Sequence, residues 1–146
     1  MKKIYSLAIT SIVAFSLAGC MGGSNSLTPA ASVKLDQREV CNVSKLGIDT
    51  VLANAKVYNA AAVKEKVEFR RLGVNNSDLI IATEEALKAK SATVTPKDFK
   101  GKETKDKFPV EYAAHRACTF GLSALQQKHE GKSTWRLAVP GDGYKY

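Results

Sequence analysis

Three side chains in the C-terminal third of the sequence have the types and spacing that could support nucleophilic chemistry. Glu111, His115 and Cys118 follow one another at intervals of four and three residues, which would place them on one face of a helix. A carboxylate that orients an imidazole beside a thiol is the arrangement that activates a cysteine nucleophile. The alternative is a surface ion pair next to a disulfide, and the rest of the sequence favours this alternative.

Other catalytic and metal-binding motifs are missing from the sequence. His115 and His129 are the two histidines, fourteen positions apart, and no C-x-x-C or H-E-x-x-H spacing offers a zinc site. The nucleophile turn of serine hydrolases and the glycine-rich phosphate loops are also missing. Glu84 and Glu85 are adjacent, so on a helix they diverge and do not form a glycosidase pair. We therefore expect a non-enzymatic protein with no catalytic residues, no metal and no cofactor.

Residues 1–19 have the features of an export signal. Lys2 and Lys3 precede an apolar stretch over 4–18, which is too short to span a bilayer of roughly 30 Å comfortably. The stretch ends in Leu17-Ala18-Gly19-Cys20, which resembles the lipobox of bacterial lipoproteins. The resemblance implies cleavage before Cys20, diacylglyceryl transfer to its sulfur and, usually, acylation of the new amino group. Two or three acyl chains, such as palmitate, anchor a protein stably.

An ordinary secretory signal with an accidental cysteine at its end is the alternative to a lipoprotein signal. Residue 21 is Met rather than Asp, which in the sorting of lipoproteins in diderm bacteria favours the outer membrane. Residues 20–34 are mostly small or polar, with Gly, Ser, Asn and Pro among them, and predict a lipidated N-terminus followed by a flexible tether. We expect residues 35–146 to form a single globular domain that faces the periplasm.

Cys41 and Cys118 are the two cysteines that remain beside Cys20. In a chain exported to an oxidising compartment, two cysteines allow one intramolecular pairing. Closing so long a loop should add about 4.5 kcal/mol of stability in the chain-entropy model. The alternative is a free Cys118 thiol whose pKa is lowered by His115. We predict the disulfide.

Three segments have apolar residues at the three- and four-residue spacing of a helix that buries one face. The first helix is predicted over 49–72, because Gly73 supplies a stop signal after it. The alternative ends this helix near Val63 and adds a short strand through Val67 and Phe69, where apolar and charged residues alternate.

The second and third helices are bounded by turn-forming residues. The second follows the polar run Asn75–Asp78 and is predicted to reach about Lys90. The third is predicted to begin at Pro109 and to end before Gly131. Gly121 in its interior costs about 1 kcal/mol relative to alanine, so we expect a close crossing with another helix there.

A small β element completes the predicted fold. Trp135, Leu137 and Val139 alternate with other residues and predict one strand, for which Glu39–Val43 is the best available partner. The lysine-rich segment 97–107 reads as a solvated loop. The expected fold class is mainly α with a small β element (α+β), with three principal helices and one two-stranded pairing, closed by the disulfide.

The net charge limits the choice of partners. It is +8 for 22 basic and 14 acidic side chains, and removal of Lys2 and Lys3 with the signal leaves +6. Nucleic acid is an improbable partner for an exported protein whose lysines are interspersed with acidic residues. A basic face could attract anionic lipid headgroups, lipopolysaccharide or an acidic protein, or could simply keep the domain soluble.

The hypothesis that fits these features is a lipid-anchored binding protein of the bacterial envelope. We expect an accessory or assembly factor of an outer-membrane complex, whose partner is another envelope protein. The alternative is an inhibitor, immunity or exclusion lipoprotein that blocks one enzyme or receptor. An inhibitor often carries a protruding loop with acidic or aromatic side chains, whereas loop 97–107 is basic and has a single aromatic residue. The sequence does not identify the partner-binding residues.

Overall fold

The structure is a computed structural model that describes residues 28–71 and 73–134. The predicted signal and lipobox with Cys20 and the predicted strand 135–139 lie outside the described residues. The elements, in chain order, are α1 (Pro29–Ser32), α2 (Gln37–Val40), α3 (Val43–Leu46), α4 (Ile48–Lys64), β1 (Arg70–Arg71), β2 (Val74–Asn75), α5 (Asn76–Lys88), β3 (Thr93–Val94), β4 (Phe108–Pro109) and α6 (Val110–Thr134). The expected α+β class is confirmed, with three long helices in the described part of the chain.

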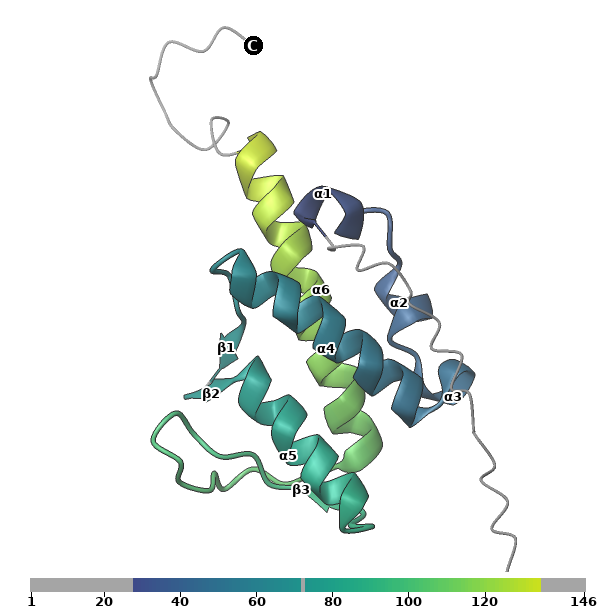
Figure 1. Ribbon diagram of the computed structural model, residues 1–146, viewed down its shortest axis with the longest axis vertical. Helices are drawn as coiled ribbons and strands as arrows, with labels where there is room; N and C mark the ends of the chain where they lie inside the picture. Colours follow the sequence, from purple (N-terminus) through teal and green to yellow (C-terminus); the bar gives the residue numbers. More distant parts are fainter. Residues whose placement is uncertain (1–27, 72, 135–146) are drawn as a thin grey trace, which may run out of the picture.

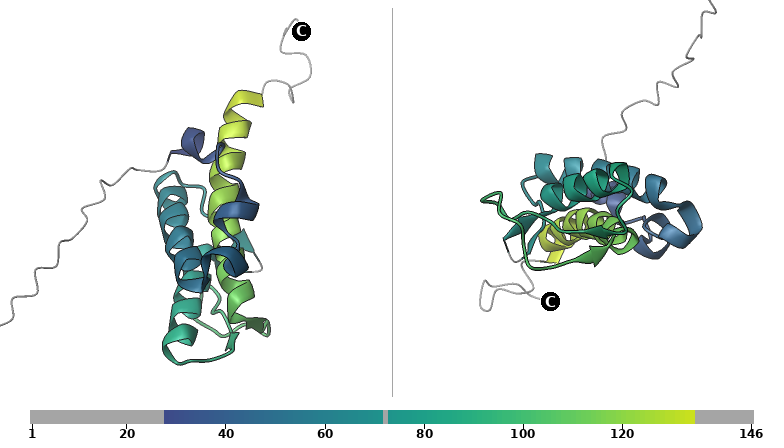
Figure 2. Two further views of the ribbon diagram at one scale, coloured as in Figure 1. Left: turned by 90° about the vertical axis from the view of Figure 1, so that its right-hand side faces the viewer. Right: turned by 90° about the horizontal axis from the view of Figure 1, so that it is seen from below.

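Helix α6 is the centre of the fold, because α4, α5 and the N-terminal α1 all pack against it (Figure 1). Seen from below, α4 and α5 form one layer and α6 lies in a second layer beneath them (Figure 2). The short helices α1–α3 follow one side of the α4–α6 pair, while the strands gather on the other side, near α5. No helix among residues 28–71 and 73–134 is long and apolar enough to cross a bilayer.

Helices α4 and α6 approach each other closely because small residues line their contact. Ala55 of α4 and Ala114 and Ala117 of α6 are completely buried. At Gly121, an added Cβ would lie only 3.0 Å from the backbone nitrogen of Asn59 in α4. The close helix crossing predicted from Gly121 is therefore confirmed.

The prediction of a continuous helix over 49–72 was wrong, since α4 ends at Lys64. The helix stops in a turn in which Lys66 takes a φ of 59° and Val67 N–H donates to the Ala62 carbonyl at 2.9 Å. This is the Schellman pattern, but its left-handed position holds a lysine instead of the usual glycine. The alternative prediction, in which the helix ends near Val63 and a strand follows, agrees better with the structure. The observed strand lies at Arg70–Arg71 instead of at Val67 and Phe69.

The predicted second and third helices are present with small shifts in their ends. Helix α5 begins at Asn76 and ends at Lys88. Asn75 caps its N-terminus, and the Asn75 backbone N–H donates to the Asp78 carboxylate. Helix α6 continues through Gly131 to Thr134, beyond its predicted end.

The prediction that Glu39–Val43 forms a strand was also wrong, because these residues belong to α2, α3 and the junction between them. Two side-chain caps favour the helical turns: Asp36 Oδ1 accepts from Arg38 N–H at 2.8 Å, and Asn42 Oδ1 accepts from Lys45 N–H at 3.1 Å. The described strands pair elsewhere, β1 with β2 and β3 with β4, both antiparallel.

The packed part of the chain begins before residue 35. Helix α1 lies in the segment assigned to the flexible tether, yet Ser32 is completely buried. The Gln126 side chain of α6 donates to the carbonyls of Ser32 and Leu35 at 3.1 and 3.0 Å. Buried backbone carbonyls need such partners, so this glutamine fixes α1 to the domain.

Candidate functional site

The sulfur atoms of Cys41 and Cys118 form the predicted disulfide, with the two Cα atoms 5.6 Å apart. Both cysteines are fully buried. His115 Nδ1 lies 2.8 Å from the Cys41 carbonyl oxygen, so its ring contacts the backbone beside the disulfide. Glu111, which is exposed, and His115 line an open surface depression with Arg38 and other residues. The structure thus favours the structural interpretation of these residues over a thiolate nucleophile.

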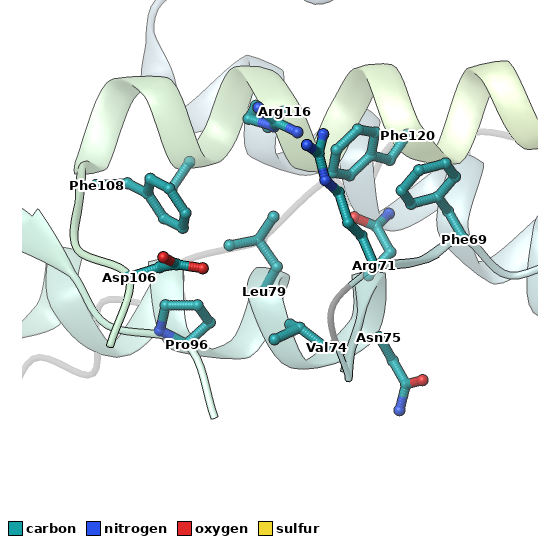
Figure 3. Close-up of a pocket in the computed structure, with 12 residues that line it drawn as sticks. Phe69, Arg71, Val74, Asn75, Leu79, Pro96, Asp106, Phe108, Arg116 and Phe120 are labelled. Carbon is teal, nitrogen blue, oxygen red and sulfur yellow. The ribbon is translucent and has the colours of Figure 1, made fainter. Parts of the chain in front are cut away.

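A pocket of about 240 Å³ lies between α5 and α6, at a place that the sequence did not indicate. Helices α5 and α6 form two of its walls (Figure 3). Leu79 of α5 projects toward its middle in the same view. The lining is mostly apolar, with residues from β1, β2, both helices and the segments around β3 and β4: Phe69, Arg71, Val74, Asn75, Asn76, Leu79, Pro96, Asp106, Phe108, Ala113, Arg116 and Phe120.

Two arginines meet at one end of the pocket. Figure 3 shows the side chains of Arg71 and Arg116, from β1 and α6, pointing toward each other. The Arg116 guanidinium lies over two rings, 4.6 Å from the centroid of Phe120 and 5.3 Å from that of Tyr112. Phe69 stacks on Phe120 with the centroids 4.1 Å apart. The aromatic rings thereby hold one guanidinium in a fixed place.

The charges of the pocket are separated along its length. Asp106 lies at the other end, near Phe108 and Pro96 (Figure 3). None of the ion pairs found in the described part of the chain involves Arg71, Arg116 or Asp106. Two guanidinium groups that face each other without a carboxylate repel, and an anion between them would relieve that repulsion.

A polar network lies beside the pocket and joins its elements. Asn76, which is 2% exposed, donates from Nδ2 to Asn59 Oδ1 and to the Ala117 carbonyl, both at 2.9 Å. Asn76 Oδ1 is buried and has no hydrogen-bond partner within the described residues. Glu68 Oε1 accepts from Ser77 N–H at 2.9 Å and also from the hydroxyl of that serine. Burial raises the pKa of the Glu68 carboxyl, but the hydrogen bonds from Ser77 and Asn59 and the charge of Arg70 together outweigh it and leave the pKa lowered.

The β1–β2 turn is held in place by loop 97–107, and it positions Arg71. Gly73 takes a φ of 82°, and its carbonyl accepts from Phe99 N–H at 2.8 Å. The Phe99 ring packs against this glycine, since an added Cβ there would lie 3.2 Å from the ring. The segment predicted as a solvated loop is indeed mostly exposed, but it also braces the turn that carries one of the two arginines.

Local sequence patterns do not single out the pocket residues. Arg71 falls in the last turn of the helix predicted over 49–72, and Arg116 belongs to no recognisable motif. The two arginines are 45 positions apart, and no local motif connects them. Cys20, the predicted lipidation site, lies outside the described residues. No cluster of three or more His, Cys, Asp or Glu side chains that could hold a metal occurs in the described ranges.

Comparison of the chain with protein-family models, with curated proteins and with solved structures found no match.

Proposed function

We propose that this protein is a lipid-anchored, non-enzymatic binding protein of the bacterial envelope that acts as an accessory or assembly factor of an outer-membrane complex. The lipobox-like run that ends in Cys20 supports the anchor, and the buried Cys41–Cys118 disulfide fits an oxidising compartment. The proposed location is the outer membrane, with the domain on its periplasmic side.

The observation that carries the binding function is the pocket between α5 and α6. It combines an apolar wall with two facing arginines that have no carboxylate partner in the described chain. A concave apolar site with a few convergent charged groups is typical of recognition. Arginine and aromatic side chains are also the residues that dominate the energetics of protein interfaces.

The proposed function is tested by site-specific photocrosslinking in living cells of the natural host. A photoreactive phenylalanine analogue replaces Asp106, an exposed residue of the pocket, and in a control chain it replaces Lys132, an exposed residue near the end of α6. Adducts are purified in detergent and identified by mass spectrometry. We expect the same several envelope proteins to be recovered from position 106 and not from position 132.

Two results would count against an assembly factor. Recovery of a single enzyme or receptor from position 106 would favour an inhibitor, immunity or exclusion lipoprotein instead. Equal labelling from both positions, or no adduct from either, would remove the support for a partner at this pocket.

A further inference from the structure

We infer that the pocket between α5 and α6 binds the C-terminal residue of a partner polypeptide. The terminal carboxylate would lie between Arg71 and Arg116, and a bulky apolar side chain would fill the space beside Leu79 and Phe108. This inference rests on the proposed function in that both involve a protein partner, but it concerns the chemistry of the ligand and has its own test.

The facing arginines indicate the charge and shape of the ligand group. A planar guanidinium binds a carboxylate through two parallel hydrogen bonds. Arg116 uses one nitrogen to donate to the Tyr112 hydroxyl, and its position over the Phe120 ring leaves further N–H groups for a ligand. Arg71 has no hydrogen-bond or ion-pair partner for its side chain among the residues described, so its guanidinium is also available.

The size of the pocket shows that it takes only the end of a larger molecule. Its volume of about 240 Å³ is below the roughly 300–1,000 Å³ of sites that enclose a drug-sized ligand. The space is sufficient for one large side chain and its carboxylate, whereas a long acyl chain would project into water. The apolar lining, with rings from Phe69, Phe108 and Phe120, favours a bulky apolar side chain at that end.

Asn76 distinguishes a polypeptide end from a fatty acid. It lines the pocket, and both hydrogens of its amide are used inside the protein, on Asn59 and Ala117. Its buried Oδ1 therefore lacks a donor within the described chain, which is a costly state for a buried oxygen. That oxygen is shielded from solvent in the empty pocket, so a ligand donor reaches it only if the Asn76 side chain shifts; the backbone N–H of a terminal residue is such a donor, and a fatty acid has none.

The test measures the binding of defined peptides to the mature lipidated protein in nanodiscs. The probe is a fluorescein-labelled hexapeptide of sequence GSGSGF with a free carboxylate, followed by fluorescence anisotropy. The same peptide with a C-terminal amide should bind at least about tenfold more weakly, because it lacks the charge that the arginines recognise. A peptide that ends in glutamate should also bind more weakly, because its side chain is charged.

Variants locate the binding site on the protein. Arg71→Gln and Arg116→Lys should each weaken binding of the free acid about tenfold, and neither should change binding of the amide. Arg70→Gln is the matched control, since Arg70 is the exposed neighbour of Arg71 in β1 and does not line the pocket. Circular dichroism and thermal unfolding establish that each variant is folded.

Three outcomes would overturn the inference: equal binding of the acid and the amide, no binding at millimolar peptide, or equal effects of Arg70→Gln and Arg71→Gln. Arginine-dependent binding of decanoate without binding of the peptide would instead assign the pocket to a fatty acid. If the peptides fail but crosslinking from position 106 recovers envelope proteins, this inference falls and the proposed function stands. If the peptides bind but no crosslinked adduct forms in cells, the inference stands and the proposed function loses its support.

Discussion

Glu68 is a carboxylate at which burial and hydrogen bonding act in opposite directions. Burial raises its pKa, and hydrogen bonds from Ser77 and Asn59 lower it, with a net pKa below its ordinary value of 4.5. A lowered pKa in the folded state means that the ionised form stabilises the fold. This contribution is fully present above pH 4.5 and is lost as the pH falls through the lower, folded-state pKa.

We therefore expect Glu68→Gln to lower the free energy of unfolding by about 1 kcal/mol at pH 7, since the carboxylate is only partly buried. The difference from the unsubstituted protein should shrink as the pH falls below 4.5. Urea unfolding at several pH values measures it. Glu103→Gln in the exposed loop controls for the loss of one negative charge. A difference that is constant with pH would show that Glu68 does not act through its charge.

Gly121 lies at a close contact between α4 and α6. A Cβ there would meet the Asn59 nitrogen at 3.0 Å and the Tyr58 Cβ at 3.1 Å, and backbone atoms cannot move without shifting a helix. We expect Gly121→Ala to destabilise the protein, because overpacking costs about 1–3 kcal/mol and the gain in helix propensity is about 1 kcal/mol.

The matched control for this substitution is Gly131→Ala in the same helix, where an added Cβ meets nothing within 4 Å. It should keep the propensity gain and raise stability slightly, by at most about 1 kcal/mol. Urea unfolding of both variants gives the comparison. If both substitutions stabilised the protein, the close crossing would not be a constraint.

At the level of the elements, the disulfide joins a segment of one-turn helices to the longest helix of the described chain. Cys41 lies at the junction of the one-turn helices α2 and α3, and Cys118 lies within the long α6. Helices of one turn are unstable on their own, so α2 and α3 depend on what fixes them to the domain. The disulfide and the His115 contact with the Cys41 carbonyl both supply this attachment.

Replacement of both cysteines by alanine should therefore reduce stability by about 4.5 kcal/mol, the chain-entropy value for a loop of this length, and should release α2 and α3 first. Hydrogen exchange followed by mass spectrometry measures the local effect, and urea unfolding measures the global one. The premise of this prediction is that the disulfide forms in the cell. It is checked by alkylating protein purified from its own host, with and without reductant, and measuring its intact mass. Two free thiols there would contradict the disulfide.

At the scale of the whole molecule, the proposed anchor determines where the pocket operates. The chain from Cys20 to Thr28, where the described structure begins, spans at most about 30 Å when extended. Under the proposed anchor, the domain would begin this close to the membrane, and its partners would include proteins attached to or embedded in that membrane. Such an anchor would raise the effective concentration of these partners, which would favour binding even when the pocket itself has modest affinity.

Cys20→Ser should abolish the anchor, because serine offers no thiol for diacylglyceryl transfer. The variant should leave the membrane fraction or accumulate as an uncleaved precursor, whereas Met21→Ala should remain with the membrane. Cell fractionation with immunoblotting, together with labelling by an alkyne fatty acid, distinguishes these outcomes. Membrane association of Cys20→Ser equal to that of the unsubstituted protein would overturn the lipoprotein assignment.

Local sequence patterns were sufficient to predict the parts of this fold that depend on periodicity or on the pairing of two residues. The apolar spacing predicted the long helices, Gly121 predicted their close crossing, and the count of cysteines predicted the Cys41–Cys118 disulfide. These features were predictable because each follows from a regular repeat or from a single possible pairing.

The end of α4 and the position of the binding pocket depend on contacts between distant parts of the chain. The sequence left two ends open for α4, one at 72 and one near Val63, and the favoured end at 72 was wrong, because the left-handed position after the helix holds Lys66 instead of the usual glycine. The pocket was missed because Arg71 and Arg116 come from a two-residue strand and a distant helix. Their proximity depends on the β1–β2 turn, on the loop that braces it and on the packing of α5 against α6, all of which are long-range contacts that local sequence patterns do not encode.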